Sequence, residues 1–164
     1  MTPEGEGRRN DVGAFEFPAD FRDFIHELNA HAVEYLLVGG YAVGMYGHIR
    51  ATADIDFFYR RGPENVDRLL HALIAFGAPA MVVNRTQLAA PHSVTQFGEP
   101  PLRIDLLSDI SGVTFDEAHA TAVRIEIAGE LLLVIGLESL RKNKTASGRS
   151  RDRDDLKHLP ATPD

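Results

Sequence analysis

The sequence contains no cysteine. This absence excludes disulfide bonds and thiolate-bound metal sites, and it fits a reducing compartment. No apolar run approaches the roughly 18 to 20 residues that a membrane span requires, and the N-terminus lacks the apolar core of a secretory signal. We therefore expect a cytoplasmic protein that has no membrane partner.

Positive charge is also scarce. The chain has 17 Lys and Arg residues against 24 Asp and Glu residues, which gives a formal net charge of −7. Its overall field does not attract nucleic acid or an anionic membrane, so any phosphate binding must be local. The seven histidines show no paired ligand spacing, so no zinc site is expected. The P-loop pattern G-x-x-x-x-G-K-[ST] and the nucleophile pattern G-x-S-x-G are absent too.

The 164 residues, 44% of them hydrophobic, suffice for one compact domain but not for two. Residues 1–14 and 160–164 are rich in polar residues, Gly and Pro and show no periodicity, so we expect both to be loose. The remaining segment, 15–159, is predicted to form a single domain.

Strand and helix patterns alternate within this segment. Apolar residues recur at helical spacing in residues 18–31 and in the helix that Pro63 opens. Strands are predicted at 35–38, 54–59, 80–84, 92–97 and 102–107, short helices at 39–47 and 114–122, a β-hairpin at 123–135, and two helical pieces within 137–159. These elements indicate an α/β (α+β) fold with a mixed central β-sheet flanked by helices.

Two aspartates stand one position apart at the start of a predicted strand. Because residues i and i+2 of a strand point the same way, the carboxylates of Asp54 and Asp56 lie side by side and repel each other unless a cation separates them. Asp105 is a third acid among apolar neighbours, and an adjacent strand could direct it to the same place. Carboxylate oxygens suit Mg²⁺ or Mn²⁺, so the three acids indicate a site for two such ions.

Gly39 and Gly40 directly follow another predicted strand. Glycines at a strand-to-helix turn let phosphate oxygens approach the backbone, so this pair would complement the acids as a nucleotide site. Each feature also has a simpler explanation. Two glycines are often only a turn, and a D-x-D pair is often a solvated strand edge. Asp105 could form a surface ion pair with Arg103 or Arg124.

The order and spacing of these features resemble the nucleotidyltransferase superfamily that includes DNA polymerase beta. Its pattern, where h is hydrophobic, is h-G-[GS], a gap of about nine to thirteen residues, D-h-[DE]-h and a later h-[DE]-h. This chain has "VGG" at 38–40, then thirteen residues, "DIDF" at 54–57 and "IDL" at 104–106. The string "GGYAVGMYGHIRATADIDF" and the tail "LRKNKTASGRSRDRDDL" are more narrowly similar to the minimal bacterial branch, which includes AbiEii-type toxins and antibiotic nucleotidyltransferases.

The resemblance implies that a nucleoside monophosphate passes from a nucleoside triphosphate to an acceptor hydroxyl, with release of pyrophosphate. It implies that Asp54 and Asp56 hold both metal ions. Asp105 would hold the catalytic ion and help the acceptor hydroxyl to lose its proton. Gly39 and Gly40 would contact the triphosphate, through backbone N–H groups alone because Gly40 stands where many members have serine.

Four further residues are candidate contacts to the triphosphate or the substrate: Arg50, Thr52, Lys144 and Arg149. Lys144 and Arg149 fall on tail positions of the family, where cations could neutralise the triphosphate or the leaving pyrophosphate. Asp152 and Asp155 share one helix face and are expected to orient these two cations rather than to bind metal.

The acceptor is the least determined part of this hypothesis. The short chain shows no second substrate domain, which favours a toxin-like enzyme that acts on RNA or protein and has an antitoxin protein as a partner. One alternative is an antibiotic-modifying enzyme with a small-molecule acceptor. Another is an inactive member that binds only a nucleotide or a partner, although three retained, mutually repelling acids argue against it.

Overall fold

The centre of the structure is a six-stranded mixed β-sheet. The structure is a computed structural model that describes residues 17–162. The strands are β1 (Tyr35–Val38), β2 (Asp54–Tyr59), β3 (Val94–Phe97), β4 (Arg103–Leu107), β5 (Val123–Ile127) and β6 (Glu130–Val134). Their order across the sheet is β3-β4-β2-β1-β6-β5. Two neighbouring pairs, β2 with β4 and β1 with β6, are parallel, and the other pairs are antiparallel, as a mixed sheet requires.

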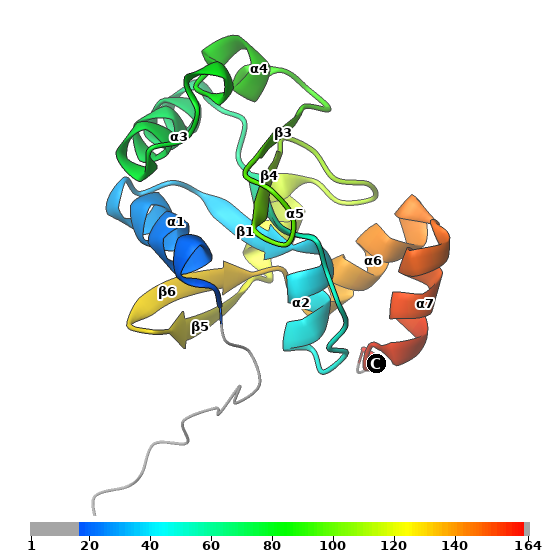
Figure 1. Cartoon of the computed structure of the whole chain (residues 1–164). Helices are drawn as coiled ribbons and strands as arrows, with labels where there is room; N and C mark the ends of the chain where they lie inside the picture. Colours follow the sequence, from blue (N-terminus) through cyan, green and yellow to red (C-terminus); the bar gives the residue numbers. More distant parts are fainter. Residues whose placement is uncertain (1–16, 163–164) are drawn as a thin grey trace, which may run out of the picture.

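Helices cover both sides of this sheet. They are α1 (Ala19–Ala30), α2 (Gly39–Met45), α3 (Pro63–Phe76), α4 (Arg85–Ala89), α5 (Phe115–Ala120), α6 (Leu137–Ser147) and α7 (Ser150–His158), and a 3₁₀ turn, η1, spans Ala80–Val82. In Figure 1, α1 and α3 lie together on one side of the sheet, whereas α2, α6 and α7 gather on the other side. The predicted fold class, a mixed sheet flanked by helices, is confirmed.

Helix α1 shows why these segments fold as they do. Its apolar residues recur every three or four positions, so one face is apolar and packs against the sheet. The ring of Phe24 on that face meets Phe57 of β2 and Phe97 of β3 edge-on, with ring centroids 5.5 and 5.7 Å apart. This layer is one part of the hydrophobic core. On the opposite face of β2, Phe58 is also buried, whereas Asp54 and Asp56 at the start of the strand are partly exposed.

The C-terminal half follows the predicted pattern closely. Strands β5 and β6 form a hairpin whose turn residues, Ala128 and Gly129, both have positive φ angles of 51° and 81°. Two positive φ values are typical of the tight turns that match strand twist. Helices α6 and α7 are joined at Gly148, whose φ of 63° ends α6 in a left-handed conformation.

The strand predicted at residues 80–84 is wrong. Residues Ala80–Val82 form the turn η1, and Asn84 is the N-cap of α4, where its side-chain oxygen accepts a hydrogen bond from the Gln87 backbone N–H at 3.1 Å. The apolar run misled the prediction because Met81 is 81% exposed, Val82 is buried and Val83 is only partly buried, which is not the alternation of a strand. The cap at Asn84 starts helix α4 here, so the segment does not continue as a strand.

The register of the sheet places the acidic residues. Ile55 and Phe57 of β2 point into the core and are fully buried, so the alternate positions Asp54 and Asp56 point to the other face. Asp56 pairs in register with Val38 at the end of β1 on one side. On its other side it pairs with Asp105 of β4.

Parts of the sequence expectation fall outside the described residues. The segment 1–14, expected to be loose, lies there, as does the end of the segment 160–164. Within residues 17–162, no helix is both long and apolar enough to cross a membrane.

Candidate active site

Three carboxylates from two strands meet on the face of the sheet that carries α2. Asp54 and Asp56 come from β2, and Asp105 comes from the parallel neighbour β4, directly opposite Asp56. One oxygen from each carboxylate lies within 4.8 Å of an oxygen from each of the others. The structure therefore brings together the three acids that the sequence analysis singled out.

A guanidinium group balances part of this negative charge. Arg103 donates to Asp105 Oδ1 at 2.8 Å and Oδ2 at 3.1 Å, and it also donates to Asp54 Oδ2 at 2.5 Å. Of the two arginines considered as partners of Asp105, Arg103 thus makes the contact, and it bridges two acids of the cluster rather than pairing with one. The hydrogen bonds that Arg103 donates to Asp105 raise the pKa of the guanidinium further.

The crowding of carboxylates changes the pKa of Asp56. Burial, followed by the negative charges of Asp54 and Asp105, raises the pKa of the Asp56 carboxyl to about 8. Asp105 also accepts a hydrogen bond from the Gln96 amide at 3.2 Å. Sequence reasoning missed Gln96, although its place on β3, in register with Asp105, would have revealed it once the strand order was known. One guanidinium does not neutralise three carboxylates. Asp56, which Arg103 does not contact, is the carboxyl whose pKa is raised, so it keeps its proton to the highest pH.

Gly39 lies against this acid at the end of β1. Its φ is +69°, and a Cβ atom built there would lie 2.0 Å from Asp56 Oδ2. Both the left-handed backbone and the lack of space therefore require glycine at this position. The chain can pass this close to the carboxylate only without a side chain.

Gly40 is confined by different neighbours. A Cβ at this position would lie 3.0 Å from Thr52 Oγ1 and 3.2 Å from an Arg50 guanidinium nitrogen. The Thr52 hydroxyl donates to the backbone carbonyl of Asp54 at 3.1 Å. The space that a serine side chain would take at position 40 is thus bordered by a threonine hydroxyl, which offers an oxygen of the same kind.

The basic tail forms a second, balanced charge cluster. Lys144 Nζ on α6 lies 3.1 Å from Asp152 Oδ1 and 3.1 Å from Asp155 Oδ2, both on α7, and all three side chains are buried. Arg149 donates to Asp152 Oδ2 at 2.9 Å, and its own side chain is 77% exposed. Arg50 donates to both oxygens of Asp155 at 2.8 and 2.9 Å.

Hydrogen bonds to these two acids outweigh their burial. Burial alone would raise the pKa of Asp152, but donors from Arg149, Ser147 and Lys144 hold it well below its usual range. For Asp155, donors from Arg50 and Lys144 outweigh burial and lower the pKa in the same way. As expected, both acids contact Lys144 and Asp152 contacts Arg149, whereas Asp155 contacts Arg50 in place of Arg149.

One cleft joins both clusters. It has a volume of about 770 Å³, within the roughly 300 to 1,000 Å³ typical of small-molecule sites. Its lining includes every residue that the sequence analysis proposed for the site: Gly39, Gly40, Arg50, Thr52, Asp54, Asp56, Asp105, Lys144 and Arg149. The lining also includes Gln96, Arg103 and Ser147, which that analysis did not place there. A cleft with acids at one end and cations at the other has the polarity that a metal-bound polyphosphate would need.

Comparisons with known proteins agree with this arrangement. Residues 18–162 match the family described as nucleotidyl transferase of unknown function (DUF2204). Among curated proteins, none matches the chain. A solved structure from Thermotoga maritima, provisionally identified as a nucleotidyltransferase, is similar with a TM-score of 0.56 and 13% identity, over 84% of this chain and 88% of that one. At this identity the likeness shows a shared fold. The family match spans most of the chain and the fold agrees with it, so the protein belongs to this nucleotidyl transferase family.

Proposed function

We propose that the protein is a metal-dependent nucleotidyltransferase that moves a nucleoside monophosphate from a nucleoside triphosphate to an acceptor hydroxyl. The observation that carries this proposal is the convergence of Asp54, Asp56 and Asp105 beside the close backbone of Gly39. Family membership supports a transferase of this general kind.

The acid cluster fits divalent metal ions. It offers hard oxygen ligands from three carboxylates, and Arg103 is the cation that contacts two of them. Burial and the negative charges of Asp54 and Asp105 raise the pKa of Asp56 to about 8, and a bound cation would relieve this repulsion. We propose that Asp54 and Asp56 bind both of two Mg²⁺ or Mn²⁺ ions and that Asp105 binds one. Such ions, when bound, would stabilise the charge that develops on the phosphate oxygens.

The remaining residues have distinct proposed roles along the cleft. Gly39 and Gly40 would let the triphosphate approach the backbone, and Thr52 would offer a hydroxyl beside it. Arg149 is the best placed cation for a phosphate contact, because its side chain is exposed in the cleft lining. Lys144 is buried between two acids, so its contribution would be a fixed positive charge rather than a mobile contact.

The proposed reaction forms one bond and breaks another. The acceptor oxygen bonds to the α-phosphorus, and the bond from that phosphorus to the bridging oxygen of the β-phosphate breaks. The electron pair leaves with pyrophosphate, whose charge Arg149 and Lys144 would help to balance. The hydroxyl proton passes to Asp105 or to water. We propose Asp105 for this role because it lies in the cleft opposite Asp56, and its hydrogen bonds with Arg103 and Gln96 fix the orientation of its carboxylate.

We propose RNA or protein as the acceptor, with an antitoxin protein as a partner. Arg149 and Arg151 are exposed residues of the cleft lining, so a large acceptor could lie across the rim and reach the acids below it. An exposed basic rim favours an anionic acceptor in a chain that is acidic elsewhere.

A transfer assay tests this function. Purified protein is incubated with Mg²⁺, cell extract and each labelled nucleoside triphosphate in turn, and the wild type is compared with Asp56→Asn. We expect label to move to RNA or protein with the wild type and to fall by about a thousandfold in the variant, because removal of one such ligand costs several kcal/mol of transition-state stabilisation. Asp109→Asn, which changes another acid of the cleft lining outside the cluster, should retain transfer.

Two other outcomes would change the proposal. Label on a small molecule would favour an antibiotic-modifying enzyme. If the protein binds triphosphate but transfers no label to RNA, protein or small molecules, the proposed enzymatic activity is contradicted. That result would favour an inactive, nucleotide-binding member of the family.

A further inference from the structure

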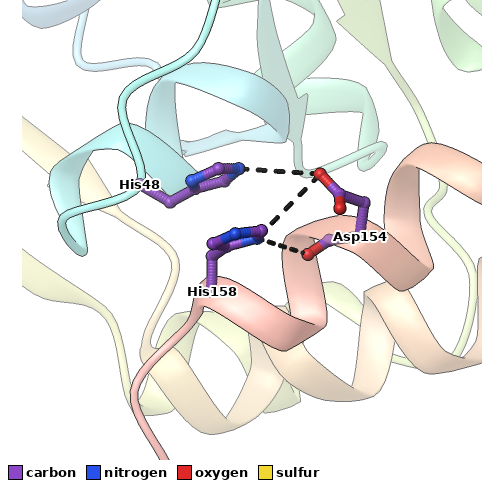
Figure 2. A group of neighbouring side chains, drawn as sticks. All are labelled: His48, Asp154 and His158. Carbon is purple, nitrogen blue, oxygen red and sulfur yellow. Dashed lines mark hydrogen bonds and ion pairs between the residues drawn. The ribbon is translucent and has the colours of Figure 1, made fainter.

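A second group of metal-ligating side chains lies outside the cleft lining. His48 comes from the segment between α2 and β2, and Asp154 and His158 lie one turn apart on α7. Figure 2 shows both imidazole rings directed toward the same carboxylate. His48 Nε2 and His158 Nδ1 are each 3.9 Å from Asp154 Oδ2, and one donor atom from each of the three residues lies within 4.8 Å of the others. Sequence spacing gave no sign of this group because 110 positions separate the two histidines.

The unpaired ring nitrogen of His48 indicates a site where a ligand could bind. Its Nε2 atom is buried and has no hydrogen-bond partner among the residues that the structure describes. The carboxylate oxygens in front of it, 3.9 Å away on Asp154 and 3.7 Å away on Asp155, are beyond hydrogen-bond length. A buried ring nitrogen is rarely left in this state without a partner. An ion between the nitrogen and a carboxylate oxygen would satisfy both atoms.

Asp155 is not the carboxylate that completes this group. Both of its oxygens accept hydrogen bonds from Arg50, and Lys144 lies 3.1 Å from one of them. Asp154 is the free acid by comparison, since its side chain is 59% exposed. The cation-binding capacity here therefore rests on Asp154 and the two imidazoles.

The two rings are already held together. They stack with centroids 4.1 Å apart and an angle of 6° between their planes. His158 Nδ1 also donates to the main-chain carbonyl of Asp154 at 2.9 Å. Coordination requires the His158 ring to turn out of this bond and out of the parallel stack. Its side chain is 50% exposed, which leaves room for that rotation.

We propose that His48, Asp154 and His158 bind one divalent transition-metal ion of the Zn²⁺ type. Two imidazoles and a carboxylate are typical ligands of such ions, whereas Mg²⁺ prefers oxygen ligands throughout. Bonds of about 2.0 to 2.1 Å place neighbouring donors roughly 3.3 Å apart in a tetrahedral site, so the present 3.9 Å distances need to close by about half an ångström. Three protein ligands leave the fourth position to water.

Such an ion would join two segments that also contribute to the cleft. The segment before β2 carries Arg50, α7 carries Asp155, and these two side chains already bond to each other. The ion would add a second link between the segment that carries Arg50 and helix α7. The expected effect is therefore on the stability of α7 docking, and the site does not depend on the proposed transferase activity.

Titration of the full-length, tag-free protein with Co²⁺ and Zn²⁺ tests the site. The Asp56→Asn background and saturating Mg²⁺ keep transition metal out of the acid cluster. Co²⁺ should give the absorption bands of a four-coordinate ion at one equivalent, and calorimetry should give the same stoichiometry with Zn²⁺. His158→Ala and Asp154→Asn should each weaken binding by more than about tenfold, since even the loss of an outer-shell partner commonly costs that much.

A matched control and a second readout keep the test decisive. His71→Ala removes an exposed histidine of α3, which lies on the other side of the sheet from α7 (Figure 1), and should leave binding unchanged. Zn²⁺ should raise the thermal midpoint of the background protein and of His71→Ala but not that of Asp154→Asn. Binding that is equally tight in His158→Ala, Asp154→Asn and His71→Ala would overturn the site, as would the absence of saturable Co²⁺ binding.

Discussion

The two charge clusters of the cleft differ in how completely their charges are paired. At the acidic end, Arg103 donates to Asp54 and Asp105 but not to Asp56, and burial together with the two neighbouring carboxylates raises the pKa of Asp56 to about 8. At the basic end, two acids share donors from three cations, and the pKa of each acid falls. The comparison teaches that a charge cluster can be built for stability or for an incoming ligand. Both carboxylates of the balanced cluster are paired with cations, whereas in the acidic cluster Arg103 contacts Asp54 and Asp105 and leaves Asp56 without a cation partner among the hydrogen bonds of residues 17–162.

The largest expected effect comes from breaking the balanced cluster. Lys144→Met removes a buried cation that lies 3.1 Å from both Asp152 and Asp155. Removal of one partner from a buried ion pair typically costs about 3 to 5 kcal/mol, because a charge is left without compensation. We expect the free energy of unfolding, measured by urea denaturation, to fall by that amount.

Lys142→Met is the matched control for this change. Lys142 lies on the same helix, its side chain is 58% exposed, and among residues 17–162 its one ion pair is with Glu138 at 3.5 Å. Its removal should cost less than about 1 kcal/mol. An equal loss in both variants would show that the buried cluster does not carry the stability assigned to it.

The second effect concerns the acidic cluster and should appear in activity rather than in stability. Gly39→Ala places a Cβ against Asp56 Oδ2 and demands a left-handed backbone from alanine. Asp56 must move by an ångström or more, and a displacement of that size can cost about a hundredfold in rate. Transfer activity should fall by this factor while circular dichroism shows a folded protein.

Gly62→Ala serves as its control because no atom lies within 4 Å of the added Cβ and the φ there is −60°. Full activity in Gly39→Ala would contradict the close approach of the backbone to Asp56. Equal loss in both variants would show that the effect is a general cost of replacing glycine.

The third effect is a pH dependence that belongs to the acidic cluster. The Asp56 carboxyl has a pKa of about 8 in the folded protein and an ordinary value near 3.8. The folded state therefore holds this proton more tightly, so its contribution to stability is fully present below pH of about 4 and is lost as the pH rises through 8. Without divalent ions, the thermal midpoint should decline over this range in the wild type and decline less in Asp56→Asn.

The same proton should compete with the metal ion that we propose for the acid cluster. Below pH 8, each unit of acidification should weaken Mg²⁺ binding by up to about tenfold, because the ion must displace the proton. Calorimetry in two buffers of different ionisation enthalpy would measure the proton released. Mg²⁺ affinity that does not change between pH 6 and 8 would contradict the raised pKa.

The smallest effect concerns the guanidinium that partly balances the acids. Arg103→Gln removes the donor shared by Asp54 and Asp105, so the local negative charge rises. We expect Mg²⁺ to bind several-fold more tightly, since it no longer competes with a resident cation. Arg151→Gln, also a cleft-lining arginine, should leave the affinity unchanged. Weaker Mg²⁺ binding in Arg103→Gln would show instead that Arg103 positions the ligands.

Local signals explain which parts of the fold the sequence predicted. The hairpin at Ala128 and Gly129 and the alternation around Asp56 depend on residues that are close in the chain. The same holds for the helix predicted at 114–122, which begins where the Thr114 hydroxyl accepts a hydrogen bond from the Glu117 backbone N–H. The wrong strand prediction at residues 80–84 also has a local cause. The apolar run favoured a strand, but the helix cap at Asn84 set the structure of this segment. Apolar content alone does not reveal whether a side chain such as Met81 meets the core.

The sequence by itself determined the α/β class, the shared face of Asp54 and Asp56, and the glycines that precede them. Only the tertiary structure decided that Asp105 stands opposite Asp56, that Arg103 bridges the acids, and that Lys144 is enclosed by α7. The physical reason is that periodicity fixes the direction of a side chain within its own element, whereas strand order and helix docking fix its neighbours. Contacts between distant segments depend on the packing of the whole core, which no short pattern encodes.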